Sequence, residues 1–462
     1  MKKYLILTIL FATFASTVSA QIRTSYFMEG STFRTDMNPA LAPTRGYLNF
    51  PVIGNTGLSI NNNFASVSNF LYPNPDGEGL VTFLHPSVDK NDFLKRLHKS
   101  NQLGISSQFS LVGFGAHTKR FYWNAGINIK ADANVMIPKE FFTLLTTLGQ
   151  GYHELNSLTV DANAYLEAYV GAAIPIKNIA TVGFRVKGLL GLASADLTAD
   201  RLYANITDEI VDANMSSTLR ISTIAARKVA PGENFELSSL AESLFNINNI
   251  GFKNYGAALD LGFEVRLIGE RLRLSAAVTD LGFISWDGDR TVEGIAQAGF
   301  IYRGFNFDNM EIDTESDGFN MTTGSTQRYI KRLNYSINAG IEYAILRNHI
   351  SFGLLAHTRF YRKSTTAEVT ASVNFKPLNW LTATASHTFL NGNKLGVMGL
   401  ALNIHPRGLN LFVGTDFVDF RHAKLRDSNV RIPINQSSAN VYVGFGFSFK
   451  YAPYRKASNS NL

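Results

Sequence analysis

The 462-residue sequence contains no cysteine, and this absence excludes disulfide bonds, thiolate metal sites and a lipid anchor on an N-terminal cysteine. After the first twenty residues it also lacks any run of about eighteen apolar residues, so no transmembrane helix is expected. Charged residues make up only 17% of the chain. Stability must therefore come from packing and from backbone hydrogen bonds.

Catalytic and metal-binding motifs are missing as well. The nine histidines form no His-Glu-x-x-His motif, and neither a Gly-x-Ser-x-Gly elbow nor a phosphate-binding glycine loop occurs. Ser386 and His387 are adjacent, but neighbours on a strand point to opposite faces. The segment beginning at Asp313 has Gly324 where a calcium loop requires glutamate. We therefore expect no enzyme, no metal and no cofactor.

The first residues have the features of an export signal. Met1-Lys2-Lys3 precedes the apolar run Tyr4–Phe14, and Val18-Ser19-Ala20 supplies the small residues that a signal peptidase recognises. Residues 1–20 are predicted to be a signal peptide. The net charge of +7 suits a basic rim facing lipid phosphates or an ordinary soluble surface, and no Lys/Arg cluster interleaved with aromatics indicates nucleic acid.

What the sequence does contain is alternation, seen most clearly in residues 438–451. One set of alternate side chains is apolar, and the other is small or polar. A period of two indicates a β-strand with one apolar face, either in a soluble sandwich or in a transmembrane barrel. In a barrel the face turned to lipid would consist of Val441, Val443, Phe445, Phe447 and Phe449.

Similar segments recur from Leu103 onward, many of them about as long as a membrane-spanning strand. We predict an all-β fold, an antiparallel transmembrane β-barrel of about 14 strands (12–16) over residues 65–451. Closure would remove the edges that an open sheet of this size exposes. Strand phase is inconsistent across residues 287–325, where either a strand is hidden or one assigned strand is false. Long loops are expected at 197–253, 308–325 and 418–437, and a tail at 452–462.

The polar faces carry charges, which fits a hydrated or plugged lumen better than a lipid-facing surface. A solvated face of a soluble sheet is the alternative. The side chains expected to face the lumen are Glu167, Arg185, Lys187, Glu264, Arg266 and Arg273.

Four short segments carry a resemblance. The segment Asp36-Met37-Asn38-Pro39-Ala40-Leu41 resembles the Asn-Pro-Ala segment of the long-chain fatty-acid transporters and of the related type IX secretion shuttle barrels. Val278–Phe283, Asn391–Leu402 and the closing strand resemble uncharacterised outer-membrane barrels of the Bacteroidota. The resemblance implies that residues 21–64 form an N-terminal plug or arm and the barrel entry, with Asn38, Pro39 and Ala40 in the plug. A plain turn before the first strand is the alternative.

These observations lead to two functional hypotheses for a protein of the cell outer membrane. The first is a passage route for a hydrophobic or amphiphilic small molecule, because an interior of fourteen strands must be filled or plugged. The second is an interaction or secretion-accessory barrel that docks a protein through its long loops. The expected partners are outer-membrane lipid, the barrel-insertion machinery, and either a hydrophobic small molecule or a secreted protein.

Overall fold

The computed structural model describes residues 23–64, 66–74, 80–147, 151–177, 179–206, 211–226, 234–235, 250–306, 311–323, 327–390, 396–418, 422–424, 431–433 and 438–451. The predicted signal peptide and the tail expected at 452–462 lie outside these residues. The helices are η1 (Arg23–Ser25), α2 (Arg34–Met37), α3 (Val67–Phe70), α4 (Lys90–Lys95), α5 (Lys139–Thr147) and η3 (Gly288–Arg290).

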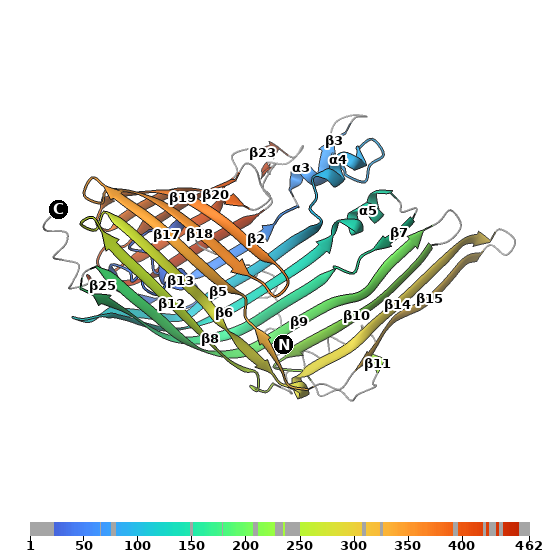
Figure 1. The fold of residues 1–462 in the computed structure, drawn as a ribbon, viewed down its shortest axis with the longest axis horizontal. Coiled ribbons are helices and arrows are strands. Elements are labelled where there is room, and N and C mark those ends of the chain that lie inside the picture. The colour runs from blue at the N-terminus through green and yellow to red at the C-terminus, as the bar shows by residue number, and fades with distance from the viewer. Residues whose placement is uncertain are drawn as a thin grey trace, which may run out of the picture.

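Most of the described chain is β-strand (Figure 1). The strands are β1 (Arg45–Asn49), β2 (Thr56–Asn62), β3 (Leu71–Pro73), β4 (Leu80–Thr82), β5 (Ser100–His117), β6 (Tyr122–Pro138), β7 (Gly151–Glu154), β8 (Thr159–Ile176), β9 (Ala180–Ile206), β10 (Val211–Thr223), β11 (Asn234–Phe235), β12 (Tyr255–Leu267), β13 (Leu272–Trp286), β14 (Thr291–Asn306), β15 (Glu311–Thr323), β16 (Tyr329–Arg332), β17 (Tyr335–Ile345), β18 (Ile350–Phe360), β19 (Thr365–Leu378), β20 (Leu381–Leu390), β21 (Val397–Ile404), β22 (Asn410–Val418), β23 (His422–Lys424), β24 (Arg431–Pro433) and β25 (Ala439–Tyr451).

The main sheet closes on itself into an antiparallel barrel of 14 strands, which confirms the predicted fold class. Strand β25 pairs with β22 on one side and with β1 and β2 on the other, and β1 and β2 in turn pair with β5. The wall therefore runs β1/β2, β5, β6, β8, β9, β12, β13, β17, β18, β19, β20, β21, β22 and β25. Short turns join the strands at one end, and longer connections join them at the other.

Side chains on the wall are apolar outside and polar inside. On β25, Val441, Val443, Phe447 and Phe449 are 36–47% exposed, and Phe445 packs its ring 5.0 Å from that of Phe50. The alternate face is buried: Tyr442 and Ser448 are at most 4% exposed. A soluble protein buries its apolar face, so this arrangement is the reverse of a sandwich and matches a barrel surrounded by lipid.

The structure corrects two of the predicted long loops. Strand β9 continues to Ile206, and β10 occupies 211–223 within the loop expected at 197–253. Strand β15 occupies 311–323 within the loop expected at 308–325. Together with β14 these segments form a sheet that projects beyond the wall at the long-loop end (Figure 1). Part of the expected loop at 418–437 is described, as the hairpin of β23 and β24.

The phase inconsistency across residues 287–325 comes from one false wall strand. Strand β14 lies within these residues and pairs with β10 and β15 in the projecting sheet and not in the wall, so counting it as a wall strand leaves one wall position unfilled. The missing wall position belongs to β1 and β2, which together make one strand interrupted at residues 50–55. A false wall strand and an overlooked one therefore offset each other in the predicted number.

A small helical unit, here called the cap, lies at the long-loop end and comprises α3, β3, β4, α4 and α5 (Figure 1, blue and teal). Its core is aromatic: Phe64, Phe93 and Phe142 are buried together with Leu97. The Asp89 side chain caps α4 by accepting hydrogen bonds from the backbone N–H groups of Asn91 and Asp92. Within the described residues, no helix is long and apolar enough to cross a membrane.

Candidate functional site

The lumen contains residues 23–44, which we call the plug segment. Nearly all of its side chains are buried, and they pack on separate parts of the wall. Phe33 joins Phe412 of β22 and Tyr442 of β25 in one cluster, whereas Tyr26 and Phe27 join Leu355 of β18 in another. The segment therefore fills the barrel from wall to wall.

Asn38, Pro39 and Ala40 fit into a notch formed by two glycines that face each other on neighbouring strands, Gly183 of β9 and Gly262 of β12. A Cβ atom at Gly183 would lie 2.2 Å from the Ala40 nitrogen, and one at Gly262 would lie 2.1 Å from the Asn38 Oδ1 atom. Only glycine allows the plug backbone to approach this closely. The same Oδ1 atom accepts a hydrogen bond from the Ala40 N–H at 2.9 Å, which closes a local turn.

The beginning of the plug segment is held by Asp416 of β22. Its fully buried carboxylate accepts hydrogen bonds from the backbone N–H groups of Arg23 at 3.2 Å and Thr24 at 2.9 Å. The Tyr442 hydroxyl donates to the same carboxylate at 2.7 Å, and the Arg23 guanidinium forms an ion pair with Glu368. A buried carboxylate needs several donors, and here the plug backbone supplies two of them.

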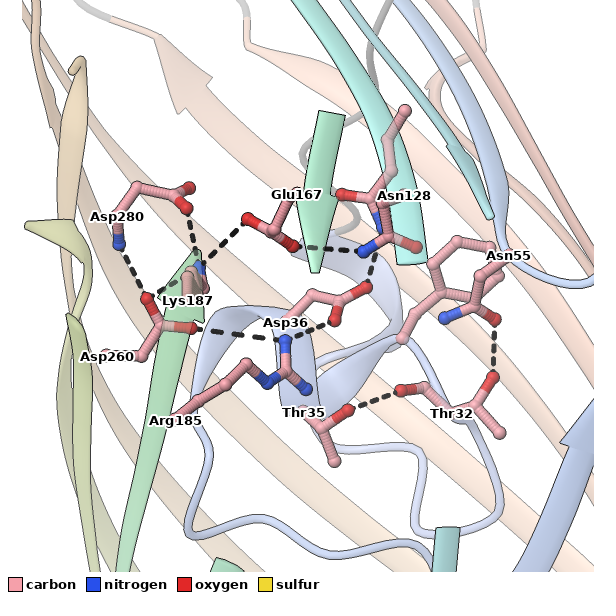
Figure 2. A network of polar contacts seen from close by, with 12 residues as sticks. Thr32, Thr35, Asp36, Asn55, Asn128, Glu167, Arg185, Lys187, Asp260 and Asp280 are labelled. Carbon is pink, nitrogen blue, oxygen red and sulfur yellow. Dashed lines mark hydrogen bonds and ion pairs between the residues drawn. The ribbon is translucent and has the colours of Figure 1, made fainter. Parts of the chain in front are cut away.

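Asp36 links the plug segment to an ionic network on the wall (Figure 2). Its carboxylate lies 2.7 Å from Arg185, which is 1% exposed. Lys187, on the same face of β9, pairs with Asp260 at 2.7 Å and Asp280 at 2.6 Å. The network continues through Glu167, 3.5 Å from Lys187 and 2.9 Å from Lys130. Four carboxylates and three cations thus compensate one another around the plug.

Two of these carboxylates come from a repeated sequence and are not among the predicted site residues. Asp260 and Asp280 each begin an Asp-Leu-Gly-Phe segment, on β12 and β13. The register shifts at this point, the Asp260 carboxylate accepts the Asp280 N–H at 2.7 Å, and Asp280 has a φ of 61°. A non-glycine residue in the left-handed region is strained and often marks a functional position. The repeat itself was the sequence signal that could have identified them.

The other predicted lumen charges lie toward the short turns. Glu264 pairs with Arg266, and Arg273 pairs with Glu29 of the plug segment and with Glu342 of β17. Lys376 also approaches Glu29, at 3.6 Å. Glu29 of the plug and Lys376 were not among the predicted site residues, because nothing in the local pattern places a side chain near a strand so distant in sequence.

Above the plug segment, toward the long loops, lies a cavity of about 70 Å³. Its lining is mostly polar: it includes Lys130, Asp132, Tyr165, Asp280, His357 and Arg359 as well as Asp36 of the plug. Arg359 lies 3.9 Å from Asp132, too far for a close ion pair. The cavity has room for a few water molecules or a small polar group.

At the opposite end the plug segment packs on His405, which follows β21. The imidazole lies 3.5 Å from the Thr44 hydroxyl, and a Cβ atom at Gly30 would lie 2.2 Å from its ring. Burial lowers the pKa of His405 to about 4. The side chain is therefore neutral at physiological pH and serves as a packing surface for the plug.

No group of three or more metal-ligating side chains occurs in the part of the chain that the structure describes. Ser386 and His387 of β20 differ in burial: Ser386 is buried and accepts or donates a hydrogen bond with Thr24, whereas His387 stacks edge-on against Phe389. The ionic network, the Asp416 anchor and the glycine notch together can hold the plug segment in the lumen through charges and backbone contacts. The segment can be released if other groups replace those contacts.

Comparison with known proteins adds a family. No curated protein matches the chain. Among solved structures, a TodX monoaromatic hydrocarbon channel with the deltaS2 mutation has 10% identity and a TM-score of 0.40, with 94% of this chain and 96% of that chain covered. Its deltaS2S3 mutant has 9% identity and a TM-score of 0.40, with 91% and 95% covered. A mutant porin of Rh. blastica has 10% identity and a TM-score of 0.20, with 62% and 92% covered. A family model matches residues 39–416, and the chain belongs to that family, DUF5723, a family of unknown function.

Proposed function

We propose that this protein is an outer-membrane barrel that gives passage to a small hydrophobic or amphiphilic molecule, with the plug segment as its gate. The observation that carries the proposal is the plug segment inside a closed barrel, held by ion pairs and hydrogen bonds and by no disulfide bond, since the chain has no cysteine. The apolar outer face supports placement in a membrane, because such a face is stable only against lipid.

The charged lumen favours an amphiphilic molecule over a purely apolar one. The cavity above the plug is lined by lysine, arginine and aspartate side chains. An apolar molecule would form no hydrogen bonds with these groups and would displace the water that hydrates them, which is unfavourable. A polar headgroup can replace that water by hydrogen bonding to the same groups. The passage would then require exchange of plug contacts for contacts with the headgroup.

A reversible lock on the plug tests this function. Thr24 of the plug and Ser386 of β20 have their hydroxyl oxygens 2.7 Å apart, and the natural chain has no cysteine. In the Thr24→Cys, Ser386→Cys double variant, oxidation would tie the plug to the wall and reduction would release it. The measurement is entry of a fluorescent fatty acid into lipid vesicles that contain the purified barrel.

We expect entry with the parent and with the reduced variant, and little entry with the oxidised variant. If neither the parent nor either form of the variant promotes entry of fatty acids or of smaller amphiphiles, the passage function is wrong. If the oxidised and reduced forms are equally active, passage occurs but the plug segment is not its gate.

The second candidate is a barrel that docks a secreted or surface protein. The projecting sheet of β9, β10, β14 and β15 favours it, because a passage barrel has no need of strands this far beyond its wall. Chemical cross-linking in intact cells, followed by purification of the barrel, should then recover one stoichiometric partner. Recovery of the barrel alone would count against docking.

A further inference from the structure

The cap does not sit over the lumen but against the outside of the wall. Leu103 of β5 and Ile137 of β6 are partly buried and pack against its aromatic core. On β6, Ile137 has the same parity as Trp123, whose ring packs 5.0 Å from Phe114. Phe114 in turn pairs with Leu48 and contacts Phe449, both exposed on the outer face. The cap therefore covers the upper part of the same apolar face that lower down meets lipid.

The height of this contact matches the edge of a membrane. Leu103 lies roughly 46 Å along β5 from the short-turn end of that strand, at about 3.3 Å per residue. With the tilt of about 40° that is usual in membrane barrels, this corresponds to about 35 Å along the barrel axis. The apolar band of such barrels is about 25 Å tall, so Leu103 lies about 10 Å above a band measured from the short-turn end, which is the outer part of the headgroup layer.

The cap also leaves apolar side chains uncovered on this side. Phe141 and Leu145 of α5 are each 37% exposed, and their spacing of four residues places them on one face of the helix. Their neighbours Phe142 and Thr146 are buried in the cap. A helix with one face packed on the cap and a second apolar face exposed is typical of a segment that lies in a membrane interface.

Cations outnumber carboxylates in the two cap segments that include this helix. Residues 89–99 and 139–147 contain four lysines and one arginine but three acidic residues, Asp89, Asp92 and Glu140, and Asp92 pairs with Arg96 at 2.5 Å. Lys99 and Lys139 start from adjacent backbone positions, since the Lys139 N–H donates to the Lys99 carbonyl at 3.1 Å. Among the described residues, Lys95, Lys99 and Lys139 have no carboxylate within ion-pair distance. Their charges are complementary to phosphate.

We propose that the cap is a docking surface for the phosphate-bearing lipids of the leaflet at the long-loop end. Phe141 and Leu145 enter the boundary between headgroups and acyl chains, and Lys95, Lys99 and Lys139 contact lipid phosphates. The inference rests on the membrane placement proposed above, but not on passage through the lumen. It assigns the cap to fixing the depth and tilt of the barrel and not to contact with a protein.

Two measurements on the full-length barrel test the proposal. In the first, Leu145→Cys supplies a single site for a spin label, and collision with lipid-soluble oxygen and water-soluble nickel reports its depth. In the second, native mass spectrometry compares retention of a lipid with two phosphates, lipid A, with retention of phosphatidylcholine. The Lys95→Gln, Lys99→Gln, Lys139→Gln variant is compared with Lys119→Gln, Arg120→Gln, which changes exposed cations at the short-turn end.

We expect the label to lie in the interface and the triple variant to lose lipid A retention. Loss should approach about a hundredfold, since each lysine near an anionic surface contributes about fivefold. The control variant should retain lipid A as the parent does. A label fully exposed to water, or equal retention by the triple variant and the parent, would overturn the proposal. Heat-modifiable gel mobility of each variant shows independently whether the barrel itself has folded into the membrane.

Discussion

The notch that receives the plug segment gives the sharpest test of the lumen architecture. Replacing Gly183 by alanine adds one methyl group, and its carbon would lie 2.2 Å from the Ala40 nitrogen, where ordinary contact begins at 3.4 Å. The β9 backbone and the plug backbone must therefore separate by about 1.2 Å. Strand β9 cannot move easily, because backbone hydrogen bonds hold it to β8 and β12. The plug is the part that must move.

Overpacking of this kind typically costs 1–3 kcal/mol, and we expect about 3 kcal/mol because no flexible side chain can yield. Gly188→Ala is the matched control, since it lies on the same strand and its methyl group would have no atom nearer than 4.0 Å. The assay is twofold: the midpoint of thermal unfolding from gel mobility, and the rate at which trypsin cleaves after Arg34, which is 1% exposed in the docked plug.

The Gly183 variant should unfold at a lower temperature and release the plug to trypsin, whereas the Gly188 variant should resemble the parent. If the plug gates passage, the Gly183 variant should also admit the fatty acid faster. Indistinguishable unfolding and cleavage in the two variants would show that Asn38–Ala40 does not occupy this notch.

Three further substitutions or conditions have defined outcomes. Asp36→Asn removes the nearest carboxylate of the buried Arg185, whose other carboxylate, Asp260, lies 3.9 Å away. The change should cost about 3 kcal/mol, measured by plug cleavage. Asp92→Asn, on the exposed pair with Arg96, should cost at most about 1 kcal/mol, and equal effects of the two variants would contradict the network. Val443→Arg places a charge on the lipid side of β25 and should lower the stability in vesicles by about 2–4 kcal/mol, with Val443→Leu near neutral; a tolerated arginine would reverse the assigned faces. His405 has a pKa of about 4 when the protein is folded and about 6.5 when it is unfolded, so protons bind more tightly to the unfolded state. The contribution of neutral His405 to the free energy of unfolding is therefore fully present above pH 6.5, and about 3 kcal/mol of it is lost as the pH falls to 4. His405→Gln should flatten that pH dependence of the unfolding midpoint, and an unchanged slope would exclude His405 as its source.

Strands of the wall could be predicted from the sequence wherever their two faces differ in chemistry. Residues 438–451 alternate without interruption, and the wall strand β25 follows from that pattern alone. Strand β15 escaped prediction because its residues, EIDTESDGFNMTT, are polar on both faces, and pairing with β14 stabilises it through backbone hydrogen bonds that leave no periodic signal. β1 and β2 were overlooked as a single wall strand because residues 50–55 break their alternation.

The site was less accessible to sequence reasoning than the wall. The inner-face charges on β8, β9, β12 and β13 could be placed by parity, but not their partners. Asp36 meets Arg185 across 149 positions, and Thr24 meets Asp416 across 392. Such contacts depend on where the plug segment lies in the closed barrel, and no local pattern of residues encodes that position.

The Asp416 anchor also bears on how the barrel can close. Pairing Arg45 with Tyr451 joins the two ends of the wall and must overcome the entropy of a loop of roughly 400 residues. Once Asp416 holds the backbone of Thr24, the chain left to be closed shortens to roughly 60 residues, which lowers the entropic cost by about 2 kcal/mol. The segment that fills the finished lumen would then also assist folding, because it would bring the first and last strands close together before their backbone hydrogen bonds form.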